Sequence, residues 1–158
     1  MDDNRLFEEI YPTLRRFAAA VSTLGADPDD LVQESVARTL RQGRRLCDLD
    51  DATSFLCRVI LNLARNQHRD TARRALMLNR TRPVTATSDV YPSEFVDLSA
   101  LTVEQRAVLF LRFVEQRTTH DIAVMLDLHE DAVRARMSRA LKALRIDIEE
   151  QRIAHEQR

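Results

Sequence analysis

The chain has little of what strands, hairpins and disulfide scaffolds need. Its 158 residues include two glycines, four prolines, two cysteines and no tryptophan. Runs of alternating β-branched residues are few, whereas alanine, leucine, arginine and glutamate dominate, and such a composition favours helices. We therefore expect an all-α protein.

Other absences exclude classes of function. Cys47 and Cys57 lack the CxxC spacing and the four histidines are scattered, so we expect no metal site and no cofactor. No stretch approaches the roughly 18 uninterrupted apolar residues of a membrane span. The acidic start, MDDNRLFEE, is unlike a signal peptide, so we expect a cytoplasmic protein without membrane insertion. No nucleophile elbow, phosphate loop or paired acid–base set is present, and we expect no enzymatic activity.

The formal net charge of −1 conceals strongly charged blocks. Residues 58–82 carry seven arginines and one acid, and residues 132–145 carry five basic residues and no acid. The blocks 1–57 and 83–131 are acidic, with net charges of −4 and −6. A single basic block is most often a solvated helix face. Two such blocks favour a protein that binds a polyanion. The guanidinium fork of arginine matches phosphate oxygens, and its binding releases the counterions condensed on a nucleic acid. The acidic blocks should then face another partner or solvent.

Apolar periodicity predicts three helices in the first half of the chain, at about 4–22, 28–42 and 54–77. Pro12 is expected to kink or divide the first helix. The apolar stripe of the second helix is predicted to be Leu31, Val32, Val36 and Leu40, which leaves Asp30, Gln33, Glu34, Arg38 and Arg41 outward. The third helix has an apolar inner face only in its first half, formed by Phe55, Leu56, Val59, Ile60 and Leu63.

Capping residues support these boundaries. Asp27 fits an N-cap, Pro28 sits at the first helical position, and Gly43 can close the far end of the second helix. In the second half, Thr102 and Gln105 have the spacing of a capping box, and Thr118 and Asp121 repeat the cap pattern.

Between the two halves the apolar period disappears, and prolines, threonines and serines indicate a flexible linker. We therefore predict two small helical domains joined by a linker. The predicted boundaries are 1–78 for the first domain, 79–98 for the linker, 99–146 for the second domain and 147–158 for a C-terminal tail.

The second domain contains the spacing of a helix-turn-helix, with a turn at Asp127-Leu128. This device lays its second helix in the major groove of DNA. In the segment EDAVRARMSRALKALR, residues 130–145, the predicted packing face is Val133, Met137, Ala140, Leu141 and Leu144. On the opposite side, the candidates for contacts with base edges and phosphates are Arg134, Ser138, Arg139 and Lys142.

Three segments carry a resemblance to a known family. DPDDLVQESVARTL, SFLCRVILNLARNQHRD and LTVEQRAVLFLRFVEQRTTHDIAVMLDLHEDAVRARMSRALKALR, in this order, resemble regions 2 and 4 of bacterial RNA polymerase sigma factors of the extracytoplasmic-function group. The resemblance covers almost the whole chain except the linker and the last dozen residues. It implies a transcription initiation factor that binds core RNA polymerase and directs it to promoters through their −10 and −35 elements.

The resemblance also implies roles for particular residues. The resemblance implies that region 2 docks on the clamp helices of core polymerase, and that the contacts are made by Asp30, Gln33 and Glu34. The following helix would melt the −10 element, with Asn62 and Asn66 facing bases and Arg65, Arg69, Arg73 and Arg74 facing phosphates. The loop at about 44–53 would shape a pocket for a flipped base. Region 4 would read the −35 element, and an anti-sigma factor is an expected partner.

Some positions depart from the family pattern. Phe55 stands where tryptophan is common, which keeps an aromatic residue. Asp127 replaces a common glycine, and we expect the turn to survive because aspartate tolerates the left-handed conformation. His129 replaces a common serine and is a poor N-cap, so we expect the start of the recognition helix to fray. The acids Asp48, Asp50 and Asp51 are unfavourable in a pocket for DNA.

Two other hypotheses remain open at this point. A sigma-like decoy would occupy an anti-sigma factor without initiating transcription, which His129, the acidic loop and the acidity of 83–131 favour. A stand-alone helix-turn-helix regulator would use its first half for dimerisation or sensing, and the resemblance to region 2 argues against it.

Overall fold

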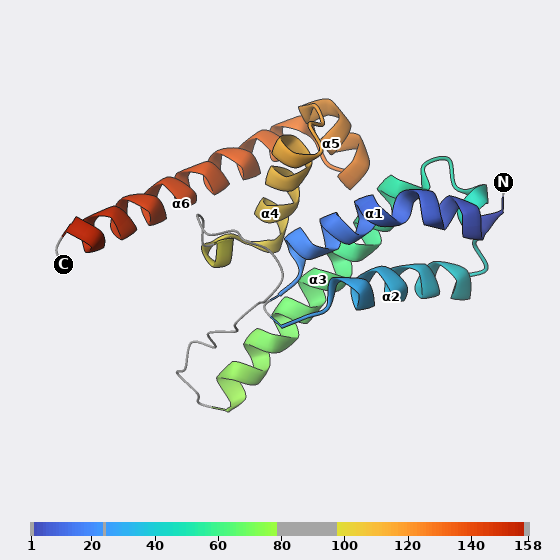
Figure 1. The fold of residues 1–158 in the computed structure, drawn as a ribbon, viewed down its shortest axis with the longest axis horizontal. Helices are drawn as coiled ribbons and strands as arrows, with labels where there is room; N and C mark the ends of the chain where they lie inside the picture. The colour runs from blue at the N-terminus through green and yellow to red at the C-terminus, as the bar shows by residue number, and fades with distance from the viewer. Residues whose placement is uncertain (1, 24, 79–97, 157–158) are drawn as a thin grey trace. The chain divides into compact units, whose positions relative to one another are not determined.

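The computed structural model describes residues 2–23, 25–78 and 98–156, and every regular element in these ranges is helical (Figure 1). The prediction of an all-α protein is confirmed. The chain divides into two compact units, Met1–Ser88 and Asp89–Arg158. No helix among the described residues is long and apolar enough to cross a membrane.

The first unit is built from three helices that pack against one another (Figure 1). They are α1 (Asp3–Val21), α2 (Pro28–Arg41) and α3 (Ala52–Met77), and a short 3-10 turn, η1 (Leu46–Asp48), precedes α3. Each helix contributes large apolar side chains to one core, which includes Leu14, Phe17, Val21, Leu31, Val32, Leu46, Leu56 and Ile60.

The helix α1 is not divided at Pro12, so of the kink or division expected there the division does not occur. Proline removes the N–H that would bond to the carbonyl four residues earlier. Pro12 is exposed, and a residue four positions earlier lies on the same side of the helix, so solvent can satisfy that carbonyl. The helix therefore continues through the proline to Val21.

The predicted ends of α2 are confirmed. The side chain of Asp27 accepts a hydrogen bond from the N–H of Asp29, and Pro28 opens the helix. At the other end Gly43 is left-handed, with φ of 74°. The Gly43 N–H donates to the Leu40 carbonyl at 2.9 Å and the Arg44 N–H to the Thr39 carbonyl at 3.3 Å, which is the Schellman pattern.

The inner face of α2 is rotated from its predicted position. Leu31 and Val32 are buried as predicted, but Leu40 is 47% exposed and Val36 is only half-buried. Ser35 and Thr39 occupy the buried positions instead. Their hydroxyls donate to the Val32 and Ser35 carbonyls of the same helix, at 2.7 and 2.8 Å, so these polar groups are buried with partners.

The second unit contains η2 (Leu98–Ala100), α4 (Val103–Leu109), η3 (Phe110–Val114), α5 (Thr119–Leu126) and α6 (Glu130–Glu156). The helix α6 packs against η2, α4 and α5. The core of this unit includes Leu101, Val103, Ala107, Val108, Leu111, Ile122, Val133 and Ala140.

Both predicted capping boxes are present in the second unit. The Thr102 side chain accepts from the Gln105 N–H, and the Gln105 side chain accepts from the Thr102 N–H. Thr118 and Asp121 make the same reciprocal pair at the start of α5. These bonds satisfy N–H groups that the first turns of α4 and α5 leave without intrahelical partners.

The end of α4 and the length of α6 were not evident from the sequence. The segment η3 is a π-helical turn in which the Glu115 N–H donates to the Phe110 carbonyl at 3.1 Å, and Gln116 after it has a positive φ of 53°. The helix α6 continues ten residues beyond the domain end predicted at 146. The predicted linker, 79–98, lies outside the described residues except for Leu98.

Replacing leucine with alanine at a buried and at an exposed position of α2 tests the rotated face of this helix. Leu31→Ala should lower the free energy of unfolding of the first unit by roughly 2–5 kcal/mol, because it leaves a cavity in the core. Leu40→Ala should change it by about 0.5 kcal/mol or less, because the side chain is half in solvent. Urea denaturation followed by circular dichroism measures both, and equal losses would contradict the burial of α2 described here.

The second capping box should make the stability of the second unit depend on pH. Two hydrogen bonds from Thr118 lower the pKa of Asp121 from its usual 3.8, and the bond from the hydroxyl has a larger effect than the bond from the N–H. Because the folded pKa is depressed, this stabilisation is present above pH 4 or so and is lost as the pH falls through the folded pKa. Asp121→Asn keeps an acceptor but cannot titrate.

Thermal melting of both proteins from pH 6 to pH 2 tests this dependence. The wild-type melting temperature should fall more steeply below about pH 4 than that of Asp121→Asn. Parallel curves would show that the Asp121 carboxylate does not contribute.

Candidate nucleic-acid and polymerase interfaces

The helix α3 changes character halfway along its length. Leu56, Ile60, Leu63 and Ala64 are buried against the other two helices. From Asn66 to Leu78 every residue is exposed. Figure 1 shows this second half extending beyond α1 and α2. Its polar side chains are therefore available to a partner along several helical turns.

The predicted −10 residues share one face of α3. At 3.6 residues per turn, positions 62, 65, 66, 69 and 73 fall within roughly 100° of arc. All are exposed except Arg65, which is half-buried and donates to the Asn62 side-chain oxygen at 3.3 Å. Within the part of the chain that the structure describes, the side chains of Arg69, Arg73 and Arg74 have no hydrogen bond or ion pair. The stripe therefore combines amides with unpaired guanidinium groups.

The same face extends toward the start of α3, where sequence reasoning did not place candidate contacts. Arg58 and Phe55 lie four and seven residues before Asn62, and both are half-buried. The guanidinium of Arg44 lies 5.5 Å from the centre of the Phe55 ring, which is cation–π geometry. The spacing 55, 58, 62 could have revealed this extension, but Phe55 was assigned to the apolar inner face.

Two acids, one in the loop and one on α1, hold the loop before α3. Asp51 is the N-cap of α3, and its side chain accepts from the N–H of Ser54 at 2.9 Å. The Cys47 N–H donates to the Asp3 side chain at 2.9 Å, which attaches η1 to the start of α1. One of the three acids that count against a DNA pocket therefore has a structural role, while Asp48 and Asp50 remain exposed.

The three predicted polymerase contacts on α2 are not equivalent. Asp30 and Gln33 are exposed and have no side-chain partner among the described residues. The Glu34 carboxylate accepts from Arg38 at 2.6 Å and from Arg41 at 3.1 Å. The Arg38 hydrogen bond is the main cause of a lowered pKa at Glu34. Asp30 and Gln33 therefore remain available to a partner, whereas Glu34 holds two arginines.

The helix-turn-helix turn forms as expected with aspartate in place of glycine. Asp127 is left-handed, with φ of 55°, and the Leu128 N–H donates to the Ala123 carbonyl at 2.8 Å. The fraying expected after His129 stays a prediction, since the structure gives only where the helix begins. The helix α6 begins at Glu130, and the His129 carbonyl accepts from the N–H groups of Ala132 and Val133 at 3.0 and 3.1 Å.

The predicted DNA face of α6 is exposed. Val133 and Ala140 are buried, Met137 and Leu144 are half-buried, and Leu141 is 42% exposed rather than packed. The four candidates Arg134, Ser138, Arg139 and Lys142 are all exposed. Arg136, also basic, is half-buried and donates to the Ala132 carbonyl of its own helix at 3.4 Å.

The candidate arginines of α6 differ in their partners. Arg134 donates to Glu130 at 2.8 Å and to Asp131 at 2.9 Å. Arg139 and Lys142 have no ion pair with any residue whose position the structure describes. No group of three or more histidine, cysteine, aspartate or glutamate side chains that could hold a metal ion occurs among the described residues.

Comparisons with known proteins match both units. The family model for Sigma-70 region 2 matches residues 6–74, and that for Sigma-70 region 4 matches residues 98–144. RNA polymerase sigma-E factors of Streptomyces avermitilis and Streptomyces antibioticus are each 29% identical to the chain. The alignments cover 90% of this chain, and 85% and 84% of the two relatives.

A solved structure has the same fold. It is the sigma factor RpoE from Bartonella quintana in complex with the anti-sigma factor NepR, at 19% identity and a TM-score of 0.68. The match covers 89% of this chain and 92% of that one. Regions 2 and 4 thus follow one another in the order and at the length of these relatives, and the chain belongs to the bacterial RNA polymerase sigma factors of the extracytoplasmic-function group.

Proposed function

We propose that this chain is a transcription initiation factor with no reaction of its own, which binds core RNA polymerase and directs it to promoters through their −10 and −35 elements. One observation carries the proposal. Each unit matches a different region of the sigma family, and each presents an exposed stripe of basic side chains on one helix.

The stripe on α3 suits the melted −10 element. Opening DNA requires that unpaired bases be captured and that the phosphate backbone be neutralised. Asn62 and Asn66 offer amide donors and acceptors for bases, while Arg69 and Arg73 offer unpaired charge for phosphates. The stacked pair of Arg44 and Phe55 extends this stripe toward the loop at 44–53, which would receive a flipped base.

The helix-turn-helix suits the −35 element. The helix α5 would cross the DNA backbone while α6 enters the major groove. Ser138, Arg139 and Lys142 would contact phosphates and base edges, and Arg134 would contact bases near the start of α6. A bidentate contact between arginine and guanine provides roughly 1–3 kcal/mol of discrimination.

The outward face of α2 suits the clamp helices of core polymerase. Asp30 and Gln33 are exposed polar groups without partners in the described part of the chain. Glu34 would act together with the arginines that it binds, Arg38 and Arg41. We extend the partner set to an anti-sigma factor, as in the structure of RpoE, and we place the protein in the cytoplasm, where promoters and polymerase are.

The decoy hypothesis has lost some of its support. His129 does not prevent α6 from starting at Glu130, and Asp51 of the acidic loop caps α3. The two hypotheses differ in one result. The experiment is in vitro transcription by core RNA polymerase from a pool of random upstream sequences, with and without this chain. Adding the chain should give new start sites that share a spaced pair of motifs. Binding to core polymerase without new start sites would favour the decoy.

Phosphate contacts on α6 should appear as salt dependence. Replacing Arg139 and Lys142 with Ala should weaken binding to −35 DNA and reduce the slope of log K against log salt by about 0.9 per lost contact. Arg5→Ala is the matched control, because it removes an exposed arginine from α1 and leaves α6 unchanged. Affinities measured by fluorescence anisotropy at several salt concentrations give the slopes. An unchanged slope in the double variant would reject the two contacts.

Polymerase binding should depend on the free side chains of α2. Replacing Asp30 and Gln33 together with Ala should weaken binding to core polymerase by roughly tenfold or more, in the range for interface residues that cost over 1 kcal/mol each. Glu9→Ala, which removes an exposed acid from α1, should not. Competition for core enzyme against a labelled sigma factor measures the difference. Equal binding by the three proteins would reject the docking surface.

A further inference from the structure

The first turn of α6 contains two acids, Glu130 and Asp131, that the proposed function leaves without a role. Glu130 Oε1 lies 2.9 Å from Nδ1 of His120, on α5. Glu130 Oε2 accepts from Nη2 of Arg134 at 2.8 Å, and Asp131 Oδ1 accepts from Nη1 of the same arginine at 2.9 Å. Two carboxylates thus hold the guanidinium fork, and one of them also joins α6 to α5.

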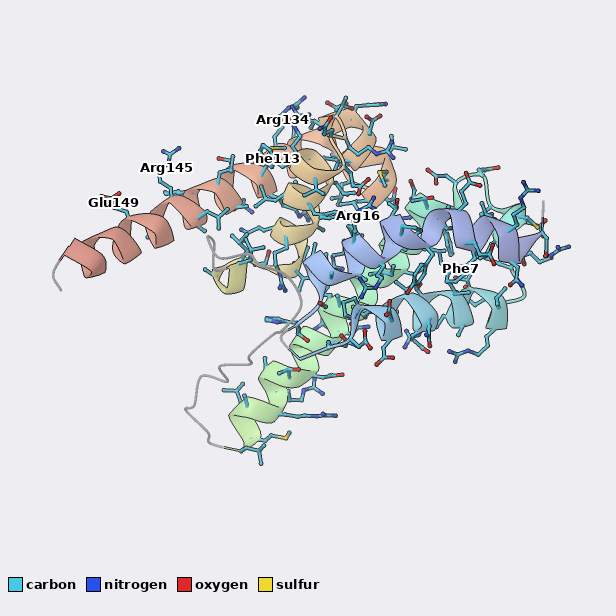
Figure 2. The ribbon with its side chains drawn as sticks, in the orientation of Figure 1. Phe7, Arg16, Phe113, Arg134, Arg145 and Glu149 are labelled. Atoms are coloured by element: carbon cyan, nitrogen blue, oxygen red, sulfur yellow. The ribbon has the colours of Figure 1, made fainter. Side chains whose placement is uncertain are left out.

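Arg134 differs from the other exposed basic residues of α6 in that its charge is paired with acids. With its charge matched by two acids, Arg134 adds little to the general attraction of DNA. Arg139 and Lys142, which have no ion pair within the described ranges, supply that attraction. Helical side chains lean toward the N-terminus, and residues at the N-terminus of a recognition helix contact base edges. Figure 2 shows Arg134 near the α5 end of α6, with Arg145 and Glu149 farther along.

We propose that Glu130 is a positioning residue for base recognition, which holds Arg134 in the orientation from which it reads a guanine of the −35 element. His120 keeps the Glu130 carboxylate in place from the neighbouring helix. Each terminal nitrogen of arginine carries two N–H groups. One can remain bonded to a carboxylate while the other donates to O6 or N7 of guanine. This inference rests on the proposed function of the second unit.

The electrostatics support a role in selectivity rather than in affinity. The hydrogen bond from His120 is the main cause of a lowered pKa at Glu130, so its carboxylate stays ionised at neutral pH. A carboxylate at a DNA interface repels phosphate and weakens binding to any sequence. Removing the Glu130 charge should therefore raise affinity for random DNA and lower base selectivity. A side chain that only stabilised the fold would not move these two quantities in opposite directions.

The experiment uses the full chain with core RNA polymerase and a promoter pool randomised in the upstream element. Sequencing the start sites gives the base preference at each position. Arg134→Ala should reduce the preference for guanine at one position by roughly 5- to 150-fold. Glu130→Gln should reduce it at the same position, and should bind a random duplex more tightly than the wild type does.

Two further variants separate positioning from a general effect on α6. His120→Ala leaves the charge of the first helical turn intact, and it should reduce the guanine preference at the same position. Glu149→Gln makes the same change of charge on the same helix, about 28 Å farther along, and should leave the preference unchanged. Circular dichroism confirms that each variant is folded.

The outcomes are distinct. If Arg134→Ala loses the preference while Glu130→Gln and His120→Ala keep it, the positioning role is overturned. If wild-type protein directs initiation but Arg134→Ala changes no base preference, the inference is overturned and the proposed function stands. If wild-type protein gives no start sites, the proposed function itself fails.

Discussion

The packing of the first half of α3 against α1 and α2 is the interaction on which the candidate −10 surface depends. Leu56, Ile60 and Ala64 fix this half in the core, with no side-chain exposure. The second half makes no such contacts with the residues that the structure describes, and a helix in water without tertiary packing is marginally stable. Because helix propagation continues from a formed turn, the packed half holds the exposed half in register. The core thereby determines where Asn62, Asn66 and the arginines of the stripe point.

The acidic residues are used in a way that net charge does not reveal. Asp27, Asp51 and Asp121 accept hydrogen bonds at helix starts, where exposed N–H groups and the helix dipole favour negative charge. Glu34 pairs with Arg38 and Arg41, and Glu130 pairs with Arg134 together with Asp131. The basic stripes on α3 and α6 contain other arginines that lack such acids within the described residues. The acids therefore do more than balance charge, because they select which cations remain available to a polyanion.

Local signals in the sequence were enough for much of this structure. The Asp27 and Gly43 ends of α2, the two capping boxes and the turn at Asp127 depend on a few neighbouring residues, and each was predictable from them. The burial of Ser35 and Thr39 was not, because their hydroxyls bond to their own helix and the neighbouring helices decide which face is covered. The π turn at Phe110–Val114 and the pairing of Glu130 with His120 likewise depend on tertiary contacts. The sequence predicted which site residues are exposed better than it predicted the side chains with which they form hydrogen bonds and ion pairs.

The exposed half of α3 has a consequence for the free protein beyond binding. Its arginines, Arg69, Arg73 and Arg74, offer trypsin-type cleavage sites on a segment with no buried side chains. Segments with few buried contacts open locally at low free energy, and proteases cleave the open form. A bound nucleic acid or protein partner that covers this face would suppress both opening and access. The exposure on which the proposed contact with promoter DNA depends therefore also predicts that cleavage in this segment is slower when the protein is in a complex.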